Sequence, residues 1–187
     1  MNSKHKICKK GGGWVLNEYL DEFNALNRQQ AIDKLMQCNT SERWCEKMEQ
    51  ARPFSDITHL YQMADDIWKE SSEVDLLQAF DGHPEIGDVS TLREKYKNTA
   101  ASAGHEQSAV KTANNKTLAA LAKGNQDYKK KFGFIFIVCA SGKSADEMLA
   151  LLLQRLPNNR QHELINAAKE QGKITQLRLQ NLVARKG

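Results

Sequence analysis

The sequence lacks paired cysteines and long apolar runs and has few aromatic residues, and each of these features argues against a class of protein. Its four cysteines form no CxxC pair, which argues against a zinc ribbon or a disulfide scaffold. Reduced thiols are expected, although Cys38 and Cys45 are near enough in sequence to form a redox pair. No apolar run approaches the roughly 20 residues of a transmembrane helix. Six phenylalanines, four tyrosines and three tryptophans accompany a net charge of +4 interleaved with acidic residues, so no nucleic-acid partner is expected.

Motifs typical of cofactor-dependent enzymes are also missing. The five histidines form neither an HExxH nor an HxH motif, so metal-ligand spacing is absent from the sequence. No GxSxG motif, phosphate-binding glycine loop or dinucleotide fingerprint is present. We therefore expect neither a metal nor a nucleotide cofactor. The basic residues 1–10 lack the apolar stretch of a secretory signal, and residues 184–187 differ from a peroxisomal Ser-Lys-Leu address, so a cytoplasmic protein with no membrane partner is expected.

Apolar residues recur at helical spacing along most of the chain and predict an all-α fold. We expect a single compact helical domain over residues 14–187, preceded by a flexible basic N-terminal arm over residues 1–13. Helices are expected from Trp14 to about Leu26, over about 28–38, from an Asn39 cap to Arg52-Pro53, from Ile57 to Trp68, over about 73–80 and 105–131, from Ser144 to Leu156, and over about 160–183.

Capping residues and one β-rich run refine this expectation. Capping boxes are predicted at Asn39 with Glu42 and at Ser144 with Glu147, and either Ser55 or Asp56 can cap another helix. Gly124 is expected either to bend the 105–131 helix or to mark a boundary. The run 134–138 is strand-like, but one short strand cannot build a sheet alone, so an extended buried connector is predicted.

His83 is the leading candidate for chemistry. It follows an apolar helix in the segment Gly82-His83-Pro84, where Pro84 stiffens the backbone. Such a loop can hold an imidazole at a fixed angle, and histidine titrates near neutral pH. On these residues alone, a structural histidine that makes a local hydrogen bond at the helix end is the commoner case.

Three further features are candidates for the same site. Glu106 begins a predicted helix, where the helix dipole favours a carboxylate, although a carboxylate on a solvated helix face is the commoner case. Arg178 lies among apolar residues of the last helix and calls for a carboxylate partner, supplied either by the protein or by a substrate. The backbone donors of residues 136–140 can bind a polar ring, or the segment can be core alone.

These segments together resemble one enzyme family. In chain order they are Arg52-Pro53-Phe54, His83-Pro84-Glu85-Ile86-Gly87, Glu106-Gln107, the run from Tyr128 to Ala140, Arg160 to Glu163 with Glu170 and Ile174, and Leu177-Arg178-Leu179. Their order and spacing are similar to those of the 2-oxo-4-hydroxy-4-carboxy-5-ureidoimidazoline (OHCU) decarboxylases over roughly residues 14–183.

The resemblance implies an all-helical, cofactor-free carboxy-lyase of urate degradation. It would act after urate oxidase and 5-hydroxyisourate hydrolase and form (S)-allantoin from a small ureidoimidazoline substrate, and a homodimer is compatible with the family. Catalytic roles are implied for His83, Glu106 and Arg178. Substrate-binding roles are implied for Pro84, Ala103, Gln107, Phe136, Ile137, Val138, Cys139 and Ala140.

Two positions depart from the family pattern. Ala103 stands where related sequences often have a serine, and Ser102 is one place earlier. Ile135 replaces a frequent proline, which removes a restraint on φ from the connector. Two other functions stay open on the sequence: a helical binding module, and a lyase or hydrolase that acts on a related ureido acid.

Overall fold

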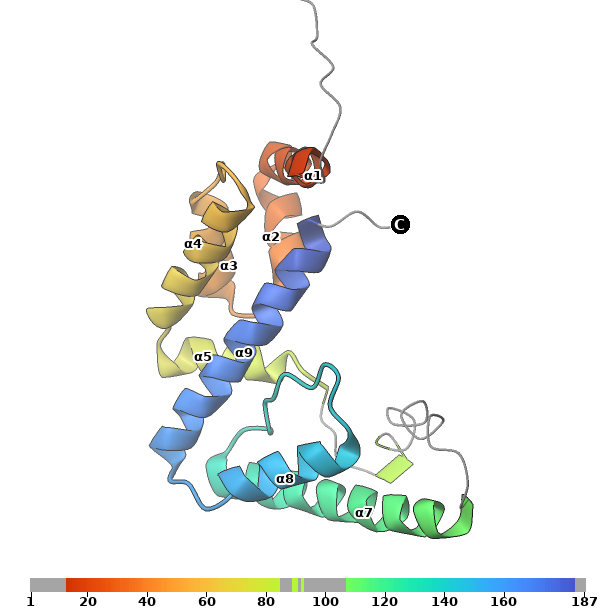
Figure 1. The fold of residues 1–187 in the computed structure, drawn as a ribbon. Helices are drawn as coiled ribbons and strands as arrows, with labels where there is room; N and C mark the ends of the chain where they lie inside the picture. The colour runs from red at the N-terminus through yellow and green to blue at the C-terminus, as the bar shows by residue number, and fades with distance from the viewer. Residues whose placement is uncertain (1–12, 85–88, 91, 93–106, 184–187) are drawn as a thin grey trace, which may run out of the picture. The chain divides into compact units, whose positions relative to one another are not determined.

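The computed structural model describes residues 13–84, 89, 90, 92 and 107–183, and this part of the chain is built of helices and their connections (Figure 1). The all-α class is therefore confirmed, whereas the arm predicted over residues 1–13 lies almost entirely outside the described residues. The described helices are α1 (Gly13–Ala25), α2 (Arg28–Met36), α3 (Glu42–Gln50), α4 (Ile57–Lys69), α5 (Glu73–Asp81), α7 (Gln107–Phe132), α8 (Ala145–Arg155) and α9 (Arg160–Val183).

The caps explain where several helices begin. Ser144 forms the predicted capping box at the start of α8, and Asp56 caps α4 by accepting from the backbone amide of His59. The capping box at Asn39 is wrong, because Ser41 caps α3 and accepts from the amide of Trp44. The side chain of Asn39 accepts instead from the amide of Ser41, so it shapes the turn before the helix.

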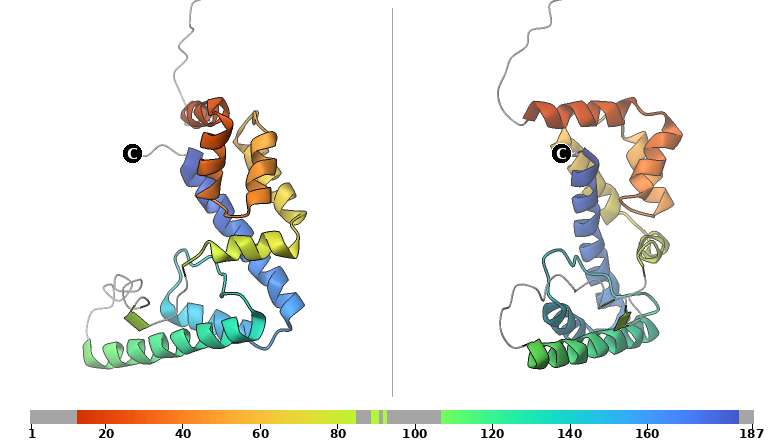
Figure 2. Two further views of the ribbon diagram at one scale, coloured as in Figure 1. Left: turned by 180° about the vertical axis from the view of Figure 1, so that it is seen from behind. Right: turned by 90° about the vertical axis from the view of Figure 1, so that its right-hand side faces the viewer.

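Gly124 does not mark a helix boundary, since α7 continues through it to Phe132. A Cβ atom placed on Gly124 would lie 2.3 Å from Cδ2 of Leu152, whose side chain is fully buried. The absence of a side chain therefore lets α8 approach α7 closely. Both views of Figure 2 show these two helices side by side.

The chain divides into two compact units, each with its own apolar core. Unit 1 contains the described residues up to Glu70 and those from Gln176 onward, and unit 2 contains those from Ser71 to Thr175. Helix α9 contributes residues to both units. The largest fully buried side chains of unit 1 include Leu20, Leu35, Trp44, Met48 and Leu60.

Unit 1 is held together by polar contacts as well as by its core. In the right-hand view of Figure 2, α1 runs crosswise to α2. The guanidinium of Arg52 donates to the carbonyl groups of Phe23, Asn24 and Leu26, which stabilises the C-terminal end of α1. The indole of Trp44 donates to the carbonyl of Ala64 at 3.1 Å and ties α3 to α4.

The cysteines that the structure describes are free thiols. Burial raises the pKa of Cys38 to about 11 and that of Cys45 to about 12, so both thiols stay protonated near neutral pH. Reduced thiols are therefore confirmed for Cys38, Cys45 and Cys139, while Cys8 lies outside the described residues. The two buried thiols behave as small apolar side chains.

Unit 2 contains the predicted connector between α7 and α8. Residues 135–140 are not helical, and the buried side chains of Phe136 and Ile137 confirm that the connector packs into the core. The rings of Phe134 and Phe136 pack against Tyr128, with centroids 5.9 and 5.1 Å from its ring. Such edge-to-face contacts hold the connector against α7.

Candidate active site

His83 is placed by the C-terminal end of α5. Phe80, fully buried, packs against the ring of Phe134 with centroids 5.4 Å apart, so the last turn of α5 is fixed on the connector. Gly82 is the C-cap residue, and the backbone amide of His83 donates to the carbonyl of Phe80 at 3.1 Å. The half-buried imidazole therefore extends from a short, well-anchored turn.

The imidazole of His83 makes a hydrogen bond to a residue that is distant in the sequence. Its Nε2 lies 2.6 Å from Oε1 of Gln171, a fully buried side chain in α9. The amide Nε2 of Gln171 donates in turn to the hydroxyl of Thr175, one helical turn further along, at 3.3 Å. This arrangement orients the ring through a neutral partner.

A cluster of buried charged and polar side chains lies against the connector. Glu163, which is fully buried, accepts hydrogen bonds from the hydroxyl of Tyr128 and from the amide of Asn158, and it forms an ion pair with Arg155. Although burial opposes the charge, these hydrogen bonds hold the pKa of Glu163 below its ordinary value. Burial and the hydrogen bond to Glu163 raise the pKa of Tyr128.

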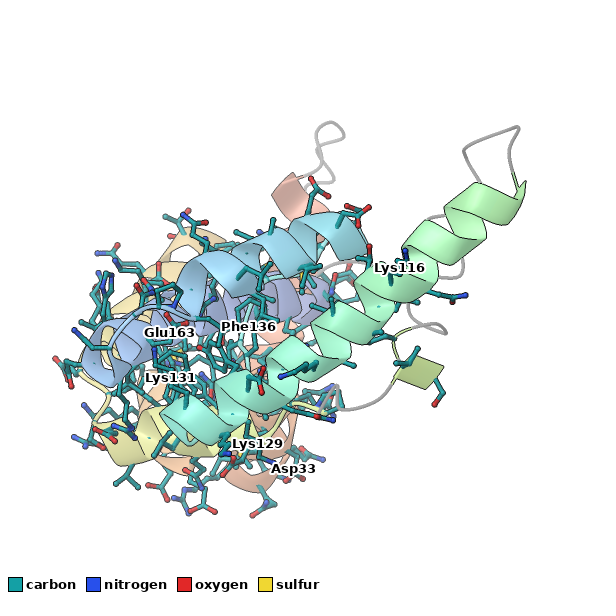
Figure 3. All side chains as sticks on the ribbon, turned by 90° about the horizontal axis from the view of Figure 1, so that it is seen from below. Asp33, Lys116, Lys129, Lys131, Phe136 and Glu163 are labelled. Atoms are coloured by element: carbon teal, nitrogen blue, oxygen red, sulfur yellow. The ribbon has the colours of Figure 1, made fainter. Side chains whose placement is uncertain are left out.

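The same cluster fixes the backbone of the connector. Arg155 donates to the carbonyl of Ile137 at 2.8 Å, and its guanidinium lies 4.7 Å from the centre of the Phe136 ring. Phe136 lies between α7 and α8 in Figure 3. The backbone amide of Cys139 donates to the carboxylate of Glu170 at 2.8 Å, so at least one of the amides predicted to bind substrate already has an acceptor.

The end of the connector is also restrained. Lys143 donates from its side chain to the carbonyl of Cys139 at 2.8 Å and from its backbone amide to the carbonyl of Ala140 at 3.1 Å. Val138, Cys139 and Ala140 are half-buried. These hydrogen bonds restrain the backbone of the segment.

Glu170 is a charged group next to the glutamine that holds His83. Burial opposes its charge, but hydrogen bonds from Lys173 and from the amide of Cys139 outweigh this effect and lower the pKa of Glu170. The carboxylate is thus ionised at neutral pH and directed to the connector. Glu170 and Gln171 are adjacent in α9. Glu170 binds the connector, and Gln171 binds the imidazole of His83.

Arg178 belongs to unit 1. Its half-buried guanidinium donates to the carbonyl of Cys38 at 3.2 Å, which joins α9 to the end of α2. Within the described residues its hydrogen-bond partner is therefore a backbone carbonyl, and a substrate carboxylate as the partner of Arg178 stays a prediction.

The remaining predicted site residues lie at the ends of the described segments or outside them. Pro84 is exposed and follows His83 directly. Gln107 is the first residue of α7, but its side chain lies outside the described residues, as do Ala103 and Glu106. The predicted roles of these four residues stay predictions.

Sequence analysis did not identify three residues that contact His83, its partner or the connector. These residues are Arg155, Gln171 and Thr175. Gln171 and Thr175 lie on the buried side of α9, with Leu164 and Ala167 before them. Two polar residues at helical spacing within an apolar stripe can be recognised in a sequence. They predict hydrogen-bond partners elsewhere in the fold, since buried polar groups need partners. No comparable pattern in the sequence indicates the ion pair of Arg155.

None of the described helices combines the length and the apolarity that crossing a bilayer requires. In the same part of the chain, no group of three histidine, cysteine, aspartate or glutamate side chains is arranged to hold a metal ion.

These features define an all-α protein in which a histidine at a helix end is held by a buried glutamine beside an ordered connector. The sequence model of the OHCU decarboxylases matches residues 24–180, and the chain belongs to that family. The resemblance noted in the sequence is therefore confirmed.

Curated relatives support this assignment. A uric acid degradation bifunctional protein from Arabidopsis thaliana is 38% identical over 155 residues, which are 82% of this chain and 48% of that protein. The 2-oxo-4-hydroxy-4-carboxy-5-ureidoimidazoline decarboxylase from Xenopus laevis is 28% identical over 171 residues, which are 87% of this chain and 93% of that one. The chain spans about half of the Arabidopsis protein and about a third of two bifunctional proteins from Bacillus.

Solved structures agree on the fold. One, described as a crystal structure of OHCU decarboxylase in the presence of (S)-allantoin, is 34% identical with a TM-score of 0.66, and the match covers 82% of this chain and 99% of that chain. A crystal structure of (S)-allantoin synthase has a TM-score of 0.64 at 16% identity, over 88% of this chain and 53% of that one, which bears on the fold alone.

Proposed function

We propose that this protein decarboxylates 2-oxo-4-hydroxy-4-carboxy-5-ureidoimidazoline to (S)-allantoin in urate degradation, without a cofactor. The observation that carries the proposal is the family match over residues 24–180, which includes His83, Arg178 and the connector. The 34% identical OHCU decarboxylase structure, determined in the presence of (S)-allantoin, supports the same reaction product.

The substrate itself supplies the electron sink that decarboxylation needs. Its carboxylate leaves from a carbon that bears a hydroxyl group and adjoins a C=N bond, so the electron pair of the broken C–C bond moves into the imine as CO₂ departs. The protein then has to orient the carboxylate, stabilise the enediol-like intermediate and protonate one face of the neighbouring carbon. Donors placed around the developing charge supply the largest part of such catalysis.

The family resemblance implies the roles of three residues, and the chemistry of each side chain suits its role. His83 acts as general acid–base, engages the hydroxyl group and delivers the proton that sets the configuration of the product. Glu106 orients substrate N–H groups or the imidazole. Arg178 binds an anionic or carbonyl group of the substrate, because a guanidinium is suited to a carboxylate.

The connector supplies backbone contacts in this proposal. The amides and carbonyls of residues 136–140 would bind the ring or the ureido end of the substrate. Glu170 already accepts from the amide of Cys139, so the other backbone groups of the segment have to make these contacts. Pro84, Ala103 and Gln107 complete the proposed binding residues. Homodimerisation and a cytoplasmic location stay predictions.

A coupled assay tests the function. Urate oxidase and hydroxyisourate hydrolase generate the unstable substrate, and circular dichroism follows chiral allantoin, because spontaneous decay gives a racemic product. We expect rapid formation of (S)-allantoin with this protein and loss of that signal with His83→Ala. A rate equal to that of the reaction without the protein would rule out the function.

The same assay separates the other functions that the sequence left open. Allantoin and allantoate, supplied in parallel, would be consumed by a lyase or hydrolase of related ureido acids. A helical binding module would turn over none of the three compounds. If His83→Ala kept normal turnover and still gave pure (S)-allantoin, the role of His83 would be wrong even though the reaction stood.

A further inference from the structure

Gln171 is a polar side chain at a buried position, where an apolar residue would be expected. It is fully buried in α9, where burying an amide without partners costs free energy. Both ends of its amide are satisfied: Oε1 lies 2.6 Å from Nε2 of His83, and Nε2 donates to the hydroxyl of Thr175 at 3.3 Å. Thr175 is itself 3% exposed.

This geometry determines which imidazole nitrogen carries the proton. An amide oxygen can only accept a hydrogen bond, so Nε2 of His83 is the donor in its contact with Gln171. A neutral imidazole has one protonated nitrogen, and its other nitrogen is a lone-pair acceptor. Nδ1 is consequently the nitrogen that can take up a proton.

We propose that Gln171, oriented by Thr175, is a positioning residue that holds His83 in the Nε2–H tautomer and thereby makes Nδ1 the nitrogen at which the ring gains and loses a proton during the reaction. The catalytic part of this inference rests on the proposed function, whereas the tautomer does not. Gln171 acts through His83 and is not itself a catalytic residue.

The choice of a neutral partner has a physical consequence. A carboxylate at position 171 would accept the same hydrogen bond but would also stabilise the charged imidazolium. An amide orients the ring without that added charge, which suits a histidine that has to gain and lose a proton in each turnover. The charged residue beside it, Glu170, is directed to the amide of Cys139.

The tautomer can be observed directly. Histidine-selective ¹⁵N labelling and long-range ¹H–¹⁵N spectra distinguish Nε2–H from Nδ1–H rings, at about pH 9 where an ordinary imidazole is neutral. We expect the Nε2–H tautomer for His83 of the full chain, assigned by comparison with His83→Ala. We expect a mixture of tautomers in Gln171→Met, and the Nε2–H tautomer again in Gln171→Glu, which restores an acceptor.

Activity supplies the second readout. In the coupled assay, Gln171→Met should lower kcat about 10- to 100-fold with a smaller change in KM, since a misoriented proton donor affects the chemical step more than binding. Thr175→Val should show a weaker effect of the same kind, and Thr175→Ser should retain normal behaviour because it keeps the hydroxyl. Gln161→Met is the matched control, since Gln161 lies exposed on the same helix.

Several results would overturn the inference. The first is an Nδ1–H tautomer in the unmodified protein, and the second is an unchanged His83 spectrum and kcat in a folded Gln171→Met variant. If Gln171→Met loses its helical circular dichroism, the Thr175→Val and Thr175→Ser pair decides, and equal tautomer populations in the two count against the proposal. An inactive unmodified protein with the Nε2–H tautomer would overturn the proposed function and leave the tautomer assignment intact.

Discussion

Arg155 and Glu163 form an ion pair in which both side chains are withdrawn from water, at 11% and 0% exposure. Removing one member of such a pair leaves a buried charge without a counter-charge. We expect Arg155→Met to lower the free energy of unfolding by about 3–5 kcal/mol, as measured by urea denaturation. The double variant Arg155→Met/Glu163→Leu should recover part of this loss, because no buried charge remains in it.

A surface pair provides the control for this prediction. Lys123 and Asp127 form an ion pair with 73% and 50% of their side chains exposed. Solvent screens such pairs, so Lys123→Met should change the free energy of unfolding by about 0.5 kcal/mol or less. Equal losses in Arg155→Met and Lys123→Met would contradict a stabilising role for the buried cluster.

The stability of the protein should also depend on pH through Glu163. Its folded-state pKa lies below the ordinary 4.5, so the unfolded chain binds a proton more readily than the folded one. The stabilisation is therefore present above about pH 4.5 and is lost as the pH falls through the lower, folded-state pKa. Urea denaturation between pH 7 and pH 3 should show this decline, and it should be shallower in Arg155→Met/Glu163→Leu. An identical slope in both proteins would exclude Glu163 as a source.

Glu170 should affect substrate binding through the connector. Glu170→Leu removes the acceptor of the Cys139 amide, so we expect faster hydrogen exchange at that amide and, given the proposed function, a KM raised about 10-fold. Glu170→Gln keeps an accepting oxygen and should change both quantities less. Lys173→Met, which removes only the exposed partner of Glu170, is the control. Unchanged exchange at Cys139 in Glu170→Leu would refute the contact.

The sequence allowed the helices to be predicted because their determinants are local. Apolar spacing and the Ser144 cap placed α8, and α9 begins and ends where the pattern indicates. The cap of α3 was misassigned because Asn39 and Ser41 are both good capping residues two positions apart, and the backbone turn decides between them. Local patterns also could not show two apolar cores, because packing between distant helices determines how a core is divided.

The site was harder to predict because its contacts join residues far apart in the chain. His83 and the connector were identified by family motifs, whereas the partner of His83 is 88 residues away. Arg155 was missed because a charged residue in the last turn of a helix is ordinary, and only the fold brings it to Glu163 and Ile137. Pairings of this kind depend on tertiary structure, which composition and periodicity do not encode directly.

A Gly124→Ala substitution has two opposing effects on the free energy of unfolding. Alanine is favoured over glycine inside a helix by about 1 kcal/mol, so an exposed Gly→Ala change would stabilise α7. At this position the added Cβ would lie 2.3 Å from Cδ2 of the fully buried Leu152, and overpacking of a core typically costs about 1–3 kcal/mol. We therefore expect Gly124→Ala to lower the free energy of unfolding by about 1 kcal/mol. In a Leu152→Ala background the clash is gone, so the same substitution should become neutral or stabilising; a penalty that persists there would show that the close approach of α8 is not its cause.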